Sequence, residues 1–91
     1  MPMPKVTLDP MLAQFAPTRQ LTSPATRVDE LVSDLESRYP ALRFRIRDES
    51  GQIRRFVKVF VNGTEIASRT GSDTPLRPDD RVDVIHSIQG G

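Results

Sequence analysis

The 91-residue chain contains no cysteine and no tryptophan, and it has one histidine. The absence of cysteine excludes disulfide bonds, a thiolate nucleophile and a cysteine-based zinc site. It also fits a reducing compartment, so a cytoplasmic location is expected. His86, the single histidine, has no clustered carboxylates around it in the sequence, and we therefore predict no metal site.

Long apolar runs and an excess of one charge are missing as well. No stretch approaches the roughly 20 apolar residues that span a bilayer, and the start of the chain lacks the apolar core of a signal peptide. Thirteen basic and twelve acidic side chains give a net charge of +1. We therefore expect no membrane and no nucleic acid as a partner, because no overall field favours either.

The length is enough for one small domain with a modest core. We expect residues 1–91 to form a single domain that ends in a flexible tail from about residue 86 to 91.

The clearest predicted element is an amphipathic helix that stops before Pro40. Thr26 is the expected N-cap, with Asp29 in a capping-box-like position. The apolar positions follow the i, i+3, i+4, i+7, i+11 spacing of one helix face. They are Val28, Leu31, Val32, Leu35 and Tyr39. This stripe predicts one helix packed on a core.

Alternating apolar and polar residues predict strands on both sides of the helix. The expected strands are residues 5–9, 18–22, 42–47, 56–61 and 82–85, with a short return at 65–66. Asn62 and Gly63 predict a tight hairpin because both tolerate positive φ. Leu76 is the expected buried anchor of a long crossing. This order indicates an α+β fold of the β-grasp type, a mixed sheet with one main helix on one face.

Five arginines lie close together in the sequence, and they are Arg43, Arg45, Arg47, Arg54 and Arg55. If the first three share a strand face, they suit an acidic partner surface or a phosphate. Neighbouring acidic residues favour a solvated strand face instead. Phe56 and Phe60 fit either the core or an exposed patch.

The sequence ends in Gly90-Gly91. Glycine lacks a Cβ atom, so two glycines can enter a narrow channel and present the carboxylate of Gly91. The alternative is an ordinary frayed terminus. If Gly91 is the natural end, no protease is needed to expose the pair.

Taken together, several segments resemble the ubiquitin-like sulfur carriers. That family includes the small subunit of molybdopterin synthase, the thiamine-pathway carrier and the carrier for cysteine synthesis. The resemblance rests on residues 35–40, 55–63, 73–82 and the terminal Gly90-Gly91. The middle segment, Arg-Phe-Val-Lys-Val-Phe-Val-Asn-Gly, is most similar to the cysteine-pathway type.

The resemblance implies a mechanism at the chain end. An E1-like enzyme, related to the ubiquitin-activating enzymes, adenylates the carboxylate of Gly91 with ATP, and a sulfur donor displaces AMP to leave a thiocarboxylate. A sulfur-accepting biosynthetic enzyme then receives the sulfur. Gly90 provides access for this chemistry. The chain itself is a carrier and not an enzyme; it binds no cofactor, and ATP is used by its partner.

The same resemblance places partner contacts before the glycines. They are Ile85, His86, Ser87, Ile88 and Gln89. This tail is more polar than many tails of the family, which leaves the cognate activating enzyme open.

Two other functions remain open. One is a ubiquitin-like modifier joined to target lysines through Gly91, and the other is a non-covalent ubiquitin-like interaction domain. Among sulfur acceptors the cysteine pathway is preferred, with molybdopterin, thiamine, a tRNA base and secondary metabolites as alternatives.

Overall fold

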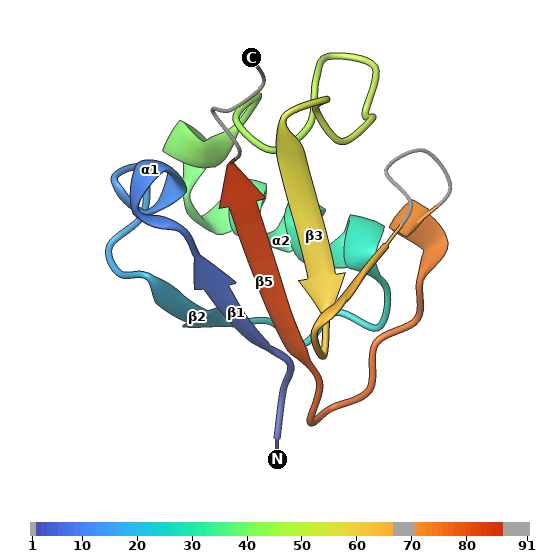
Figure 1. Ribbon diagram of the computed structural model, residues 1–91. Coiled ribbons are helices and arrows are strands. Elements are labelled where there is room, and N and C mark those ends of the chain that lie inside the picture. The colour runs from blue at the N-terminus through green and yellow to red at the C-terminus, as the bar shows by residue number, and fades with distance from the viewer. Residues whose placement is uncertain (1, 67–70, 87–91) are drawn as a thin grey trace.

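The computed structural model describes residues 2–66 and 71–86. It contains a mixed five-stranded sheet in the order β2-β1-β5-β3-β4, with the main helix, α2, across one face (Figure 1). The strands are β1 (Lys5–Leu8), β2 (Gln20–Thr22), β3 (Val57–Val61), β4 (Thr64–Glu65) and β5 (Arg81–His86). The helices are α1 (Pro10–Ala13) and α2 (Val28–Arg38), with 3-10 turns η1 (Pro40–Leu42) and η2 (Gly71–Asp73). The predicted β-grasp architecture is confirmed.

The centre of the sheet is β5, the last strand in the chain. It pairs in parallel with β1, where Leu8 faces Val84, and antiparallel with β3, where Val61 faces Val82. A strand with partners on both sides has its backbone groups paired along its length. The segment leading into the chain end is therefore the best supported strand of the fold.

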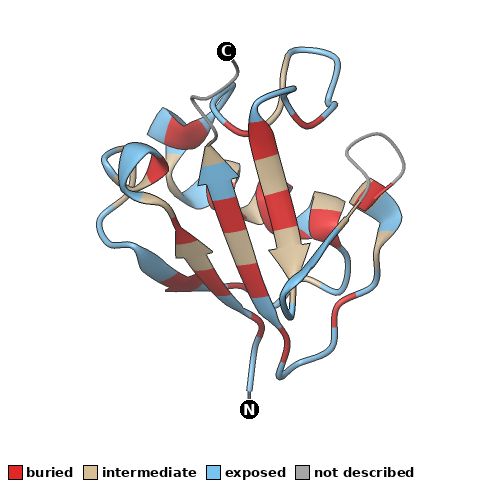
Figure 2. Cartoon of the chain, viewed as in Figure 1, coloured by how far each residue is buried: buried red, intermediate tan, exposed pale blue. Residues whose placement is uncertain are grey.

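The core lies between α2 and the covered face of the sheet. Four members of the predicted stripe are confirmed, because Val28, Leu31, Val32 and Leu35 are each at most 1% exposed, while Tyr39 is the C-cap of α2 and is half-buried. They pack with the inward residues of the strands, including Val82 and Val84. Each such side chain contributes about 1.5–3 kcal/mol on burial. Figure 2 shows the resulting alternation of buried and less buried residues along β3 and β5.

The start of α2 differs from the prediction by one residue. Arg27 occupies the N-cap without a side-chain cap bond. Thr26 instead donates from its backbone N–H and its hydroxyl to Glu30 Oε1, at 3.1 and 2.8 Å. These two bonds, the backbone one first, lower the pKa of the Glu30 carboxyl. The side chain that accepts the hydrogen bonds of Thr26 at the start of the helix is therefore Glu30, four residues later, and not Asp29.

The prediction of a strand at residues 42–47 is wrong. Leu42 ends η1, and the chain then turns through Phe44, whose φ is +66°. Leu42 and Ile46 are both fully buried while Phe44 is 50% exposed. A turn at Phe44 satisfies the same apolar–polar alternation as a strand, so the pattern alone could not separate the two.

Because that strand is absent, the arginines at 43, 45 and 47 share no strand face. Arg47 pairs with Glu36 of α2 at 2.5 Å. The guanidinium of Arg45 lies over the ring of Phe15, 4.1 Å from its centroid.

The predicted hairpin and the crossing anchor are confirmed. Asn62 and Gly63 connect β3 to β4 with φ values of +51° and +86°. Leu76 is 6% exposed. The Asn62 amide also donates to Asp80 Oδ1 at 2.9 Å, which links the hairpin to the start of β5.

Among residues 2–66 and 71–86, no helix is long and apolar enough to cross a membrane.

Candidate functional site

The candidate site begins where β5 ends, at the same end of the molecule as α1 (Figure 1). The last described residues are Ile85 and His86. The predicted positions Ser87, Ile88, Gln89, Gly90 and Gly91 lie outside the described residues. The site is therefore described through Ile85 and His86, which form the base of the tail.

Asp9 holds this base from the side of β1. Its Oδ2 accepts a hydrogen bond of 2.5 Å from the backbone N–H of His86. Its Oδ1 accepts one of 2.9 Å from Leu12 and so caps α1. Its own N–H donates to the carbonyl of Val84 at 3.1 Å. One residue thus ties β1, α1 and the end of β5 together.

His86 extends β5 by one residue beyond the predicted start of the tail. It faces Val57 of β3 in the sheet register. Its side chain is half-buried, and its Nδ1 is buried with no hydrogen-bond partner among the described residues. His86 is thus built into the sheet, where it anchors the base of the tail.

Ile85 points to the opposite face, away from α2. It is 39% exposed and faces Lys58 in the sheet register. Phe60 lies half-buried on β3, facing Asp83, and Phe56 is 41% exposed just before β3. Ile85 is thus accessible on the face of the sheet that α2 does not cover.

A groove of about 460 Å³ lies beside the base of the tail. It is formed by α1 and the residues after it, the turn at Phe44, Arg54 and the end of β5. The lining residues are Met11, Leu12, Gln14, Phe15, Phe44, Arg45, Arg54 and His86. The groove therefore brings together residues from four separate parts of the sequence.

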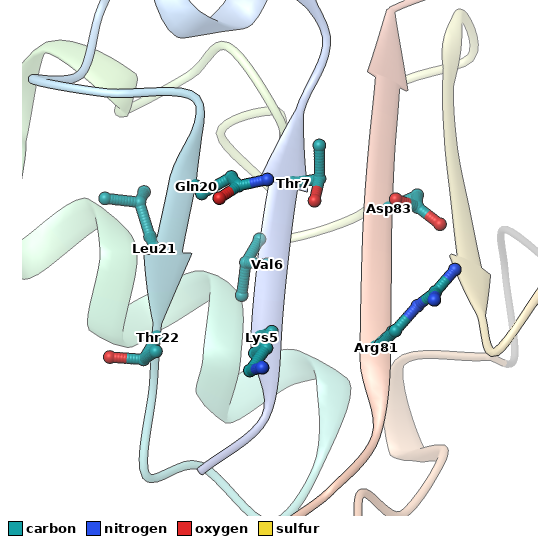
Figure 3. A pocket seen from close by; sticks show the side chains of 8 residues that line it. All are labelled: Lys5, Val6, Thr7, Gln20, Leu21, Thr22, Arg81 and Asp83. Atoms are coloured by element: carbon teal, nitrogen blue, oxygen red, sulfur yellow. The ribbon is translucent and has the colours of Figure 1, made fainter.

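A second hollow, of about 630 Å³, lies over β1, β2 and the start of β5 (Figure 3). Lys5, Thr7, Gln20, Arg81 and Asp83 give it a polar lining. None of the predicted tail contacts belongs to it, so it is not the candidate site.

A metal site was not expected, and within the described residues no group of three or more histidine, aspartate or glutamate side chains is placed to hold an ion. Among the described residues outside α2, the pKa is lowered at Asp80 and at Asp48. Hydrogen bonds from the Arg77 backbone and then the Asn62 amide lower the pKa of the Asp80 carboxyl. The Ser50 hydroxyl is the main cause that lowers the pKa of Asp48. Both are turn-forming carboxylates.

Asp9 was not singled out from the sequence, although a signal was present. Asp9-Pro10 stands directly before the apolar residues Met11 and Leu12. Aspartate at an N-cap with proline at the first helical position is a typical helix start. A four-residue helix is too short to show apolar periodicity, so the apolar pattern of these residues does not predict α1.

A sequence profile described as "ThiS family" matches residues 13–91. The sulfur carrier protein CysO of Mycobacterium tuberculosis is 32% identical over 63 residues, which cover 67% of this chain and 68% of CysO.

Solved structures agree on the fold. The small archaeal modifier protein 1 (SAMP1) of Methanosarcina acetivorans is 27% identical, with a TM-score of 0.83 over 100% of this chain and 98% of that one. The structure of the Amycolatopsis orientalis BexX/CysO complex contains a chain that is 22% identical, with a TM-score of 0.83, covering 96% of this chain and 98% of its own length.

Proposed function

The chain belongs to the ThiS family of ubiquitin-like sulfur carriers, and we propose that it carries sulfur as a thiocarboxylate on the terminal carbonyl of Gly91. The observation that carries the proposal is the base of the tail. β5 pairs with β1 up to Val84 and with β3 up to His86, and Asp9 holds the last described N–H. A rigid base followed by five residues that end in Gly-Gly suits delivery of a chain end into a partner's site.

The chemistry assigned to the chain end is an exchange of oxygen for sulfur. A carboxylate oxygen of Gly91 attacks the α-phosphorus of ATP, and pyrophosphate leaves. Sulfide then attacks the acyl carbon, and AMP leaves with the former carboxylate oxygen. The product is a thiocarboxylate, whose sulfur is more nucleophilic than the oxygen it replaced. No redox step is needed when the donor is at the oxidation level of sulfide.

The chain's own contribution is presentation. Two terminal glycines carry no side chains that would block a narrow channel. The partner supplies the nucleotide site and the acid–base groups. We propose an E1-like activating enzyme as the first partner and a sulfur-accepting biosynthetic enzyme as the second. The Amycolatopsis orientalis CysO was solved in complex with BexX, and this pairing of a carrier with another protein supports a protein partner.

Intact-protein mass spectrometry tests this directly. The full chain is incubated with a candidate activating enzyme, ATP and sulfide. We expect a mass gain equal to the replacement of one oxygen by sulfur, located at Gly91 by fragmentation and absent without ATP. A variant without Gly90 and Gly91 is the control and is expected to show no gain. Failure of the full chain with several activating enzymes would refute the thiocarboxylate mechanism.

We propose cysteine biosynthesis as the destination of the sulfur, which the likeness to CysO and to the cysteine-pathway carriers supports. The thiocarboxylated chain is offered separately to a cysteine-synthase-type enzyme supplied with an activated serine and to a molybdopterin synthase large subunit supplied with its pterin precursor. The pathway is supported if the chain returns to its carboxylate mass and cysteine is formed, and if this happens only with the cysteine-synthase-type enzyme. Sulfur transfer only in the second would refute it.

The likeness to SAMP1, whose name describes a modifier, favours protein conjugation as the second candidate function. Conjugation would join Gly91 to a lysine amine of a target. Arg81 is the last basic residue before the chain end, so trypsin would leave residues 82–91 on each modified lysine. Peptide mass spectrometry of cell lysate searched for that branched remnant distinguishes a modifier from a carrier alone.

A further inference from the structure

The groove beside the base of the tail has two chemical features that the proposed function does not use. One is a pair of guanidinium groups, on Arg45 and Arg54. The other is exposed apolar surface on Met11 and Phe44, which are 38% and 50% exposed. They come from three separate places in the sequence, Met11, Phe44–Arg45 and Arg54, which the fold brings together.

The guanidinium groups are held in place, and no described carboxylate pairs with them. Arg45 lies over the ring of Phe15 at 4.1 Å, and Arg54 donates from Nε to the carbonyl of Phe44 at 2.6 Å. The ion pairs within residues 2–66 and 71–86 involve Arg27, Arg38, Arg47 and Lys58 as the cations, and neither groove arginine. Holding a side chain in advance lowers the entropy lost when it binds.

Asp48 is the acidic side chain whose pKa the charge of Arg54 helps to lower, but the two form no ion pair, and one carboxylate oxygen of Asp48 is engaged within its own loop. Its Oδ1 accepts hydrogen bonds from the backbone and hydroxyl of Ser50 and from the backbone of Gln52. It therefore shapes the loop and leaves the guanidinium of Arg54 free to bind a second carboxylate.

Phe44 gives a second, independent indication. Its φ of +66° is uncommon for a bulky residue and costs free energy. Its ring is half exposed, so burial in the core does not repay that cost. In this conformation Phe44 lines the groove and its carbonyl accepts the hydrogen bond from Arg54. A strained, exposed aromatic residue fits a contact surface better than a folding role.

We propose that this groove docks an acidic segment of a protein partner, with Arg45 and Arg54 pairing with its carboxylates and Phe44 and Met11 contacting its apolar side chains. Charge complementarity identifies the occupant, because two fixed cations flanked by apolar surface match a peptide that mixes carboxylates with leucine-like residues. His86 lines the same groove, so the docked segment lies beside the base of the tail. The assignment of this partner to the enzymes that process the tail rests on the proposed function.

The test uses the full chain labelled with ¹⁵N and a synthetic peptide of about ten residues that combines glutamates with two leucines. We expect saturable shifts of the backbone amides of Met11, Phe44 and Arg45, and binding that weakens as salt rises, since exposed ion pairs are screened. The same peptide with glutamine in place of glutamate is expected to cause no saturable shift. Equal shifts with both peptides would overturn the proposal, as would no shift with the acidic one.

Variants separate the groove from general charge effects. R45E/R54E is expected to weaken binding by about tenfold or more, which corresponds to about 1.4 kcal/mol. R77E/R81E makes the same change in net charge outside the groove, in the segment before β5 and at the first residue of β5. It is expected to leave the Kd within about twofold. Equal weakening by both pairs would overturn the proposal.

Phe44→Gly distinguishes a binding role from a folding role. Glycine adopts positive φ without strain, so the urea midpoint is expected to fall no lower than that of the parent chain while the peptide binds more weakly. A lower midpoint with unchanged peptide affinity would overturn the contact assigned to Phe44.

Two further probes decide the class of partner and the dependence on the tail. Neither ATP nor a single-stranded oligonucleotide is expected to compete with the acidic peptide; displacement by either would overturn an acidic protein segment as the occupant. The variant without Gly90 and Gly91 is expected to bind the peptide as well as the full chain. Peptide binding is thus measured independently of thiocarboxylate formation, so either proposal can fail while the other stands.

Discussion

Replacing Asp9 with alanine tests how the base of the tail is held. The substitution removes the N-cap bond to Leu12 and the bond from the His86 N–H. Loss of an N-cap costs about 1 kcal/mol. Loss of a hydrogen bond to a charged acceptor costs about 1.5 kcal/mol or more. We therefore expect the free energy of unfolding to fall by about 2–3 kcal/mol, or Tm to fall by about 10–20 °C for a domain of this size.

Urea denaturation measures the total effect, and hydrogen exchange separates its parts. Exchange of the His86 amide is expected to accelerate more than that of Val82, which keeps its place in the middle of β5. Asp9→Asn retains one acceptor oxygen and turns an amide N–H₂ toward the other donor. Its free energy of unfolding is therefore expected to lie between those of the parent chain and Asp9→Ala. Asp79→Ala is the matched control, because Asp79 is exposed and lies in a turn.

The argument would be refuted if Asp9→Ala cost no more than Asp79→Ala. If Asp9→Ala lowers the stability but the His86 amide exchanges no faster, the hydrogen bond from His86 to Asp9 is refuted. The cap of α1 would then be the only role left for Asp9.

Three further predictions concern the fold that supports the site. Leu35→Ala should lower the free energy of unfolding by about 2–5 kcal/mol, because it opens a cavity under α2; a loss below about 1 kcal/mol by urea denaturation would contradict this packing. Gly63→Ala should cost about 1 kcal/mol or more, since φ there is +86°; an unchanged Tm would contradict the left-handed turn. The pKa of Asp80 is lowered from its ordinary 3.8 by bonds from Arg77 and Asn62, so its stabilisation is complete above that pH and is lost as pH falls through the lower folded value. Asp80→Asn should remove that part of the acid dependence in urea denaturations at pH 2–6, and an identical pH profile would argue against it.

The helix and the hairpin were predictable because their signals are local. Alternation of apolar residues with a period of 3.6 has one common explanation, a helix with one buried face. Asn62-Gly63 likewise carries its own conformational preference, which the structure shows as two positive φ values. The family resemblance depended on similar short segments and on Gly90-Gly91.

The segment from residue 42 to 47 shows where local reasoning failed. A period of two predicts a strand only if all the apolar residues face one side, and here Phe44 turns outward while Leu42 and Ile46 are buried. Pro40 had started a 3-10 turn, and packing of Leu42 and Ile46 on the core decided the path. The neighbouring residues in the sequence do not show whether this segment pairs as a strand or turns to pack Leu42 and Ile46 on the core.

The sequence by itself determined that this chain folds as one helix on a mixed sheet and resembles the sulfur carriers, because periodicity, turn residues and the terminal glycines act over a few positions. Only the tertiary structure decided that Asp9 holds the N–H of His86 across 77 positions of sequence, and that Arg45, Arg54, Phe44 and Met11 share a groove beside it. Contacts of this kind depend on the order of strands in the sheet and on the direction of each loop. They arise only when the whole core is packed, so no local pattern contains them.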